Sequence, residues 1–318
     1  MHTHAVVVEQ PGQLSLRRLE LSAPGPADVV VDMHCSGIST GTERLLWSGR
    51  MPHFPGMGYP LVPGYESVGE VVEAGADSGR TAGERVFVPG AACYGEVRGL
   101  FGGSASRVVI PGARAVPIDA DLPAEQGALL ALAATAWHAL HPPADDAVAS
   151  LPDLVVGHGV LGRLIARVTV AAGGAPPVVW EIDSRRRAGA DGYSVIHPDE
   201  DDRRDYARIC DVSGAPALLD TLIPRLAHGG EIVLAGFYSE PLSFAFPAAF
   251  MREARLRVAA EWRADDLLAV RECLAAGRLR LDNLVTHRLP ASQAPRAYET
   301  AFGDPDCLKM VLDWRDTA

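Results

Sequence analysis

Leu154-Val-Val-Gly-His-Gly-Val-Leu-Gly162 is the stretch of this 318-residue chain that says most about its architecture. Three apolar residues before the first glycine have the pattern of a short buried strand, and the segment 161–172 is apolar at helical spacing. Between them, Gly157 permits a tight turn, Gly159 lets the backbone approach a pyrophosphate, and Gly162 allows close helix–strand packing. The pattern therefore predicts a dinucleotide-binding turn.

The residues that would hold the dinucleotide follow from this turn. The helix N-terminus, at Val160 and Leu161, supplies amide donors and a partial positive charge for the diphosphate. Glu181 lies 24 residues after the first glycine, near the spacing of about 20 at which an acid binds the ribose 2′-hydroxyl. Because a carboxylate there repels a 2′-phosphate, we predict NAD as the cofactor. Arg186, at the centre of 185–187, keeps NADP open as an alternative.

Short apolar runs and longer helical patterns alternate after this turn. Strands are expected at 178–180, 207–212 and 231–235, and helices at 216–227 and 264–276. This alternation is typical of a parallel, doubly wound sheet of the Rossmann type. A last helix at 292–302 is expected between two short apolar runs, at 285–289 and 308–312.

The first third of the chain is different, because it is rich in Gly, Pro and short β-prone segments. These segments lie at 5–8, 29–33, 67–72, 85–88 and 107–110. They predict a compact β-barrel or sandwich-like module. Near residue 122 the pattern changes to an Ala- and Leu-rich helix from Pro123 to Leu140. We therefore predict an α/β chain with one domain at 1–121 and 285–318 and a second at 122–284.

Composition limits the classes of function. At roughly 100–200 residues per domain the length fits two domains, and 48% hydrophobic with 22% charged residues fits a globular protein. Forty acids against 29 bases give a net charge of −11, which argues against a nucleic-acid surface. The longest mainly apolar run, 127–140, has 14 residues, fewer than the roughly 18 of a membrane span. No integral membrane segment is expected.

The cysteines indicate the redox compartment of the protein, and the single lysine argues against lysine-based catalysis. The five cysteines are scattered and odd in number, which argues against a disulfide framework and favours a reducing compartment. The N-terminal segment lacks the pattern of a secretion signal, so a cytoplasmic protein is expected. Lys309 is the only lysine, so chemistry built on a lysine, such as a Schiff base or a Tyr-x-x-x-Lys pair, is not expected.

Motifs along nearly the whole chain resemble the medium-chain dehydrogenase/reductase superfamily. The matching segments are 62–72 (Val-Pro-Gly-Tyr-Glu-Ser-Val-Gly-Glu-Val-Val) with 82–86, then 229–237, 285–288 and 308–312. The resemblance implies a GroES-like β-rich catalytic domain joined to a Rossmann domain. It also implies hydride transfer between a substrate and a nicotinamide cofactor.

The departures from that superfamily concern its metal site. Zinc-dependent members have a Cys in the first catalytic loop and a His before the motif's glutamate, where this chain has Ser39 and Tyr65. No Cys occurs in 129–132, and Glu66 alone remains of the usual ligands. Because a catalytic zinc normally needs three protein ligands, we predict an active site without a metal.

Oxidation of an alcohol without zinc needs side chains that handle the proton. Ser39, Thr42 and Tyr65 are candidates to position the substrate oxygen, and Glu66 is a candidate to accept or relay its proton. The alternative is structural, with hydroxyls that cap the loop and a glutamate in a buried hydrogen bond. His138 is a further candidate base because imidazole titrates near neutrality, and a histidine satisfied within its helix is the alternative.

A second set of segments resembles one branch of the superfamily, the enzymes that act on bacteriochlorophyllides. These segments are 40–52, 54–66, 90–95, 101–103 and 235–238. The resemblance implies NAD-dependent oxidation of the C3 1-hydroxyethyl group of a chlorin to acetyl, in the cytoplasm or at the periphery of photosynthetic membranes. Composition and periodicity do not point to that substrate.

A chlorin substrate would need a broad, flat, apolar pocket, which we expect in a wide cleft between the domains. Trp47, Phe54 and Tyr59 would form its walls, although such residues also pack loops. Arg50 would pair with a propionate, and His53 would approach a propionate or the chlorin magnesium; exposed loop positions are the alternative. Two other activities stay open, a zinc-free quinone or enone reductase and a non-catalytic NAD-binding sensor. The oligomeric state is also open, with a homodimer among the options.

Overall fold

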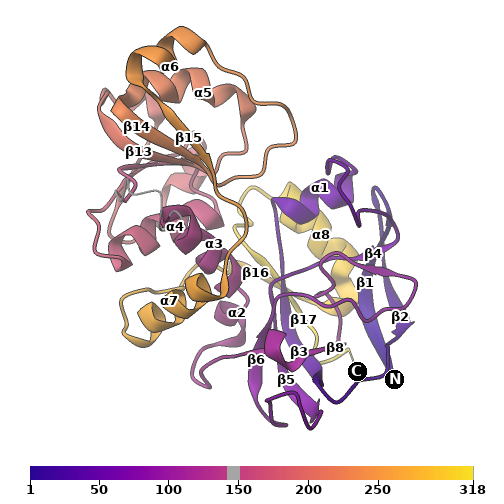
Figure 1. The fold of residues 1–318 in the computed structure, drawn as a ribbon. Helices are drawn as coiled ribbons and strands as arrows, with labels where there is room; N and C mark the ends of the chain where they lie inside the picture. The colour runs from indigo at the N-terminus through magenta and orange to yellow at the C-terminus, as the bar shows by residue number, and fades with distance from the viewer. Residues whose placement is uncertain (142–150, 318) are drawn as a thin grey trace. The chain divides into compact units, whose positions relative to one another are not determined.

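The computed structural model describes residues 1–141 and 151–317. The chain forms two compact units, unit 1 with residues 1–131 and 282–318, and unit 2 with residues 132–281 (Figure 1). Unit 1 contains two β-sheets and unit 2 a parallel sheet with helices, so the expected α/β fold class is confirmed. No helix in the described ranges is long and apolar enough to cross a membrane.

Unit 1 is built mainly from short strands. They are β1 (His2–Gln10), β2 (Gln13–Glu20), β3 (Asp28–Ile38), β4 (Leu61–Val62), β5 (Ser67–Ala74), β6 (Arg85–Val88), β7 (Arg98–Gly99), β8 (Arg107–Pro111), β9 (Val116–Pro117), β16 (His287–Pro290) and β17 (Met310–Asp313). Its α-helices are α1 (Thr42–Ser48), α2 (Ala124–Gly127) and α8 (Ala294–Gly303), and α3 (Leu130–Leu140) begins at its border. All five β-prone segments expected in the first third are strands.

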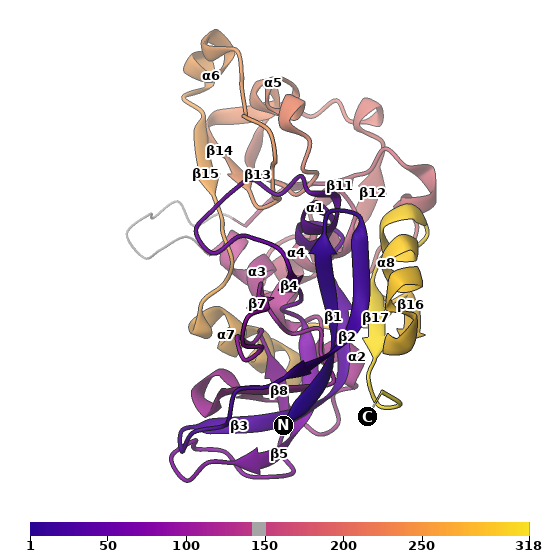
Figure 2. The same cartoon turned by 90° about the vertical axis from the view of Figure 1, so that its right-hand side faces the viewer.

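Strand β3 is the centre of unit 1. It pairs with β5, β8 and β17 in a seven-stranded sheet, while β2, β1, β4 and β7 form a second sheet. The side chains of Val29, Val30 and Val31 are fully buried, as expected for a strand covered on both faces. Helix α8 packs against β2, β16 and β17 (Figure 2).

The sheet register brings distant segments together at the end of β3. Gly37 lies opposite Val311 of β17, and its amide donates to the carbonyl oxygen of Glu66 at 2.7 Å. The residue before β5 and the residue before β17 therefore meet at the point where β3 leads into α1.

Unit 2 is a six-stranded parallel sheet with the order β12-β11-β10-β13-β14-β15. The strands are β10 (Leu154–Val156), β11 (Val178–Trp180), β12 (Ser194–Ile196), β13 (Tyr206–Asp211), β14 (Leu226–Leu234) and β15 (Arg255–Val258). Its helices are α4 (Val160–Ala171), α5 (Leu219–Leu222), α6 (Phe246–Arg252) and α7 (Ala264–Ala275), with most of α3. Chain order reverses between β10 and β13, and ligands bind beyond the strand ends at such a point.

Several local expectations are wrong. The helix expected from Pro123 to Leu140 is two helices, because the short α2 packs on β3 and β5, where a Cβ on Gly127 would lie 2.8 Å from Val68. The helix expected at 216–227 is three short turns that end at Arg225, since Pro224 lacks the N–H a continuing helix needs. The elements β2, β12, α1, α6 and β15 were not expected.

Candidate functional site

Three hydroxyl groups in unit 1 form a hydrogen-bonded line, which we call the hydroxyl line: Thr42, Tyr65 and Ser39. The Tyr65 hydroxyl donates to Ser39 Oγ at 2.8 Å, and Thr42 Oγ1 lies 3.5 Å from the Tyr65 oxygen. Because Tyr65 has a single hydroxyl proton, which Ser39 receives, Thr42 is the donor in the second contact. The structure thus brings together three of the predicted catalytic side chains.

The Ser39 hydroxyl can donate one hydrogen bond to an acceptor outside the hydroxyl line. Ser39 Oγ accepts from the Tyr65 hydroxyl and, at 3.3 Å, from the backbone N–H of Thr42, so both of its lone pairs are occupied. Its own O–H remains a donor. Burial, with help from the nearby charge of Glu66, raises the pKa of Tyr65, so this phenol stays protonated near neutrality.

Glu43 of α1 is hydrogen-bonded to the backbone of Ser39 and was not predicted as a site residue. It is buried, and it accepts from the Ser39 backbone N–H at 3.2 Å and from the Tyr298 hydroxyl of α8 at 2.5 Å. Burial raises the pKa of its carboxyl to about 7, although the Tyr298 hydrogen bond acts in the opposite direction. A group that titrates near neutrality therefore supports the loop that carries Ser39.

The only lysine of the chain is paired with Glu66 in the same region. Lys309 Nζ and Glu66 Oε2 are in direct contact, and both side chains are buried. A Cβ on Gly37 would lie 2.4 Å from Glu66 Oε2 and 2.9 Å from Lys309 Cε, so only glycine leaves room for the pair. Burial raises the pKa of Glu66, and the charge of Lys309 acts against this shift.

This pair changes the interpretation of two residues. The sequence had suggested no place for a lysine near the chemistry, but Lys309 lies beside the residues before β5 that include Tyr65 and Glu66. The carboxylate of Glu66 faces Lys309, and within the described residues it has no hydrogen bond to the hydroxyl line. Glu66 is therefore in a buried ion pair with Lys309, and its proton-relay role stays a prediction.

The donor set at this position does not suit zinc. Ser39 and Tyr65 contribute neutral hydroxyls that bond to each other, and the one carboxylate, Glu66, is paired with a cation. Across residues 1–141 and 151–317, no three His, Cys, Asp or Glu side chains are grouped so as to hold a metal ion. A catalytic zinc normally has three such ligands, so these residues do not fit the group.

The glycine turn of unit 2 has the geometry of a phosphate-binding loop. Gly157 has a φ of +104°, which favours glycine, and a Cβ on Gly162 would lie 1.9 Å from the Gly157 carbonyl oxygen. A Cβ on Gly159 would meet no atom within 4 Å, so the backbone is open there. Helix α4 follows, and no side chain caps its N-terminus, which leaves the amides of Val160 and Leu161 for an anion.

Glu181 follows β11 and is held against this turn. Its Oε2 accepts from the His158 backbone N–H at 3.0 Å and its Oε1 from that of Asp183 at 2.9 Å. Each carboxylate oxygen keeps a further lone pair for a hydroxyl group. The neighbouring arginines make other contacts. Arg185 forms an ion pair with Asp183 at 2.8 Å, and Arg186 is exposed, with its backbone carbonyl oxygen in contact with the His158 ring.

His138 lies on α3 in unit 2 and is hydrogen-bonded to Asp266 of α7. Its Nδ1 is 2.8 Å from Asp266 Oδ2, an oxygen that also accepts from the Arg263 backbone N–H at 2.7 Å. This arrangement joins α3 to the N-terminus of α7. It is the arrangement expected for a satisfied helix histidine, and a role as base stays a prediction.

The predicted pocket residues are divided between packed and exposed positions. The ring of Trp47 packs on Phe302 of α8 with centroids 5.6 Å apart, and the Tyr59 hydroxyl donates to the Leu46 carbonyl. Phe54 is partly buried against the small cluster around Leu46. The remaining two predicted pocket residues, Arg50 and His53, are exposed.

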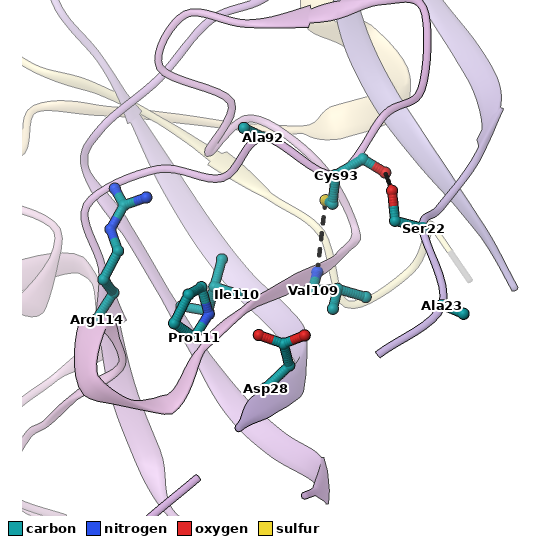
Figure 3. A pocket seen from close by; sticks show the side chains of 9 residues that line it. All are labelled: Ser22, Ala23, Asp28, Ala92, Cys93, Val109, Ile110, Pro111 and Arg114. Atoms are coloured by element: carbon teal, nitrogen blue, oxygen red, sulfur yellow. Dashed lines mark hydrogen bonds between the residues drawn. The ribbon is translucent and has the colours of Figure 1, made fainter. Parts of the chain in front are cut away.

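A cavity of about 330 Å³ in unit 1 is separate from all of these residues (Figure 3). It is lined by the first residue of β3, Asp28, by β8 and by Cys93 and Arg114. Asp28 is already bonded to the Gly25 amide at 2.8 Å, and Cys93 Sγ accepts from Val109 at 3.5 Å. It contains none of the predicted catalytic, cofactor or pocket residues.

A unit of two β-sheets joined to a unit with a parallel sheet and a glycine turn is the architecture of the medium-chain alcohol dehydrogenases. Residues 25–120 match the family described as the alcohol dehydrogenase GroES-like domain. The 2-desacetyl-2-hydroxyethyl bacteriochlorophyllide A dehydrogenase of Cereibacter sphaeroides is 59% identical over 323 residues, which cover 100% of both chains. The chain therefore belongs to the medium-chain dehydrogenase/reductase superfamily, in the family that includes this bacteriochlorophyllide dehydrogenase.

Solved structures share the fold at lower identity. A dehydrogenase from Sinorhizobium meliloti 1021, bound to NADP, has a TM-score of 0.81 with 21% identity, covering 98% of this chain and 99% of its own. An alcohol dehydrogenase from E. coli CFT073, complexed with NADH, has a TM-score of 0.82 with 22% identity and the same coverage. The expected GroES-like and Rossmann architecture is confirmed.

Proposed function

We propose that the protein oxidises the C3 1-hydroxyethyl group of a bacteriochlorophyllide to acetyl, with NAD as hydride acceptor and without a catalytic metal. The observation that supports this substrate is the 59% identity, over the full length, to a protein named for a hydroxyethyl bacteriochlorophyllide. The same similarity favours a dehydrogenase over the quinone or enone reductase and over the non-catalytic sensor.

The cofactor proposal rests on the turn before α4 and on Glu181. The amides of Val160 and Leu161 and the open backbone at Gly159 would hold the diphosphate, and Glu181 would accept a hydrogen bond from the ribose 2′-hydroxyl. NAD, when bound, supplies a hydride acceptor for the substrate carbon. The buried carboxylate of Glu181 supports NAD over NADP, because a second negative charge on the ribose would lie against it.

The hydroxyl line would handle the substrate proton. As hydride leaves the carbinol carbon, the oxygen becomes a carbonyl and must release its proton. In the orientation described above, Ser39 would donate to this oxygen, and the bonds run from Thr42 through Tyr65 to Ser39, which is the direction of reduction. For oxidation the three hydroxyls would turn, so that Ser39 accepts the substrate proton in place of the Tyr65 bond and donates its own to Tyr65, which donates to Thr42. Thr42 is partly exposed, so the proton can leave there to water. The raised pKa of Tyr65 disfavours a stable tyrosinate along this path.

The absence of a metal role follows from the donors, which are two hydroxyls and a carboxylate paired with Lys309. A conjugated macrocycle beside the reacting carbon would lower the need for a Lewis acid, because it can delocalise positive charge that develops there. Trp47, Phe54 and Tyr59 remain our proposal for the apolar walls of the substrate pocket, and Arg50 and His53 for its polar edge.

We also propose that the protein works as a homodimer, in the cytoplasm or at the surface of photosynthetic membranes. The edge strand β15 supports the dimer, because its Val258 is 74% exposed and the adjacent α6 exposes Phe246, Phe250 and Met251. The backbone N–H and C=O groups along an edge strand are open to pairing with another chain. Light scattering of the purified protein tests this, since a monomeric wild type, or a dimer unaffected by Val258→Arg, would contradict it.

The experiment that tests the proposed activity uses chelator-treated protein, a hydroxyethyl bacteriochlorophyllide, and NAD or NADP in parallel. We expect formation of NADH together with the acetyl pigment, and no such reaction from Ser39→Ala. Failure of the wild type to oxidise the pigment would contradict the substrate. One tightly bound zinc per chain, with activity lost on chelation, would contradict the metal-free site, and a preference for NADP would contradict the cofactor.

A further inference from the structure

A buried arginine ties the glycine turn of unit 2 to the loop that carries the three arginines. Arg163, on the first turn of α4, is 8% exposed. Its Nε donates to the His158 carbonyl at 3.1 Å, and its Nη1 donates to the Gly189 carbonyl at 2.9 Å. Its Nη2 donates to the carbonyls of Arg186 at 3.1 Å and Ala188 at 2.8 Å.

His158 adds a second tie to the same loop. The side chain is completely buried, with Nδ1 at 2.6 Å from the Arg186 carbonyl oxygen and Nε2 at 2.8 Å from the Tyr193 hydroxyl. A carbonyl oxygen only accepts, so the ring proton is on Nδ1 and Tyr193 donates to Nε2. Burial lowers the pKa of His158 to about 4, which agrees with a neutral ring.

The hydrogen bonds of Arg163 and His158 connect this loop with Glu181, the residue that is expected to select the cofactor. The backbone N–H of His158 donates to Glu181, while its side chain and the guanidinium of Arg163 hold the carbonyl of Arg186. The loop 184–189 therefore has a fixed position relative to the Glu181 carboxylate. The three consecutive arginine side chains of this loop start from that fixed backbone.

We propose that Arg163 and His158 are positioning residues that set the preference between NAD and NADP. They hold the loop 184–189 so that the Glu181 carboxylate, and not an arginine guanidinium, faces the 2′-oxygen of the adenosine ribose. Neither residue needs to contact the cofactor. The inference rests on the proposed cofactor site and adds the residues that determine its selectivity.

The test measures the dissociation constants of NAD and NADP for the full-length protein in the absence of a substrate. In Arg163→Met all four side-chain ties are lost, and we expect the ratio of NAD affinity to NADP affinity to fall by about tenfold or more. Arg252→Met is the matched control, because Arg252 also donates to a backbone carbonyl, that of Pro224 at 3.1 Å, but lies on α6. Its ratio should equal that of the wild type.

A change of stability alone would lower the affinity of both dinucleotides equally, so the ratio separates positioning from a structural role. Arg163→Lys keeps the charge with a single donor group, and it should shift the ratio in the same direction if Arg163→Met does not fold. An unchanged ratio in a folded Arg163 variant would overturn the inference. A wild type that prefers NADP would overturn both the proposed cofactor and this inference, whereas a wild type that prefers NAD, with an unchanged ratio in the folded variant, would overturn the inference alone.

Discussion

Replacing Lys309 by Met should destabilise unit 1 strongly, because it leaves the Glu66 carboxylate buried without its cation. Lys309 is 1% exposed and Glu66 is 0% exposed, so water cannot replace the lost partner. Breaking a buried ion pair from one side costs about 3–5 kcal/mol. At about 2–4 °C per kcal/mol for a unit of this size, the melting temperature should fall by about 6–20 °C.

The pH dependence of this loss has a defined sign. Burial raises the pKa of Glu66 and Lys309 opposes that shift, so the variant should have a still higher pKa at this carboxyl. An acid with a raised pKa in the folded state stabilises the fold below its unfolded pKa of about 4.3, and loses that contribution as pH rises. Lys309→Met should therefore be closest to the wild type near pH 5 and furthest from it near pH 8.

Thermal and urea unfolding of unit 1, followed by circular dichroism at both pH values, measure the effect. The double variant Lys309→Met with Glu66→Gln should recover much of the stability, because no charge is left buried. Arg17→Met is a matched control at an exposed ion pair, where Arg17 and Glu9 lie 3.2 Å apart, and should cost less than about 1 kcal/mol. A Lys309→Met variant as stable as this control at pH 8 would refute the reasoning.

Four further predictions concern the proposed site. Tyr65→Phe removes the donor to Ser39 and should lower kcat by about a hundredfold with unchanged NAD affinity, and an unchanged kcat would remove the proton path. Glu43→Gln should flatten the profile of stability against pH, measured by urea unfolding, since a pKa of about 7 makes the wild type lose about 2.5 kcal/mol between pH 5 and 8. Glu181→Gln should weaken NAD by about ten- to a hundredfold relative to NADP in a binding titration. Phe54→Ala should raise KM for the pigment without changing NAD affinity, and equal effects on both would place Phe54 outside the pocket.

The parts of the fold that sequence could predict depend on local patterns. The glycine turn, β10 and α4 follow one another along the chain, and their residues carry the signal themselves. The turns at 216–225 were mistaken for one helix because apolar spacing alone does not show where Pro224 interrupts the hydrogen bonds. The strand β15 is only four residues long, with two arginines, and resembles a loop.

The candidate site was predictable only in part, because its contacts join distant segments. Ser39, Thr42 and Tyr65 could be found from the positions of the missing metal ligands. The pairing of Glu66 with Lys309 depends on the register of β3 with β17, which no local pattern reveals. One signal was present, since a single lysine directly before the apolar residues Met310 to Leu312 suggests a charge at the start of a buried strand.

Isotope transfer tests the central claim most directly. The pigment would carry deuterium at the carbon of the 1-hydroxyethyl group that bears the hydroxyl, and metal-free protein would be mixed with NAD. The account predicts one deuterium in each NADH formed and an acetyl product that has lost it. Formation of NADH that contains no deuterium, or of NADH without conversion of the pigment, would contradict hydride transfer from that carbon.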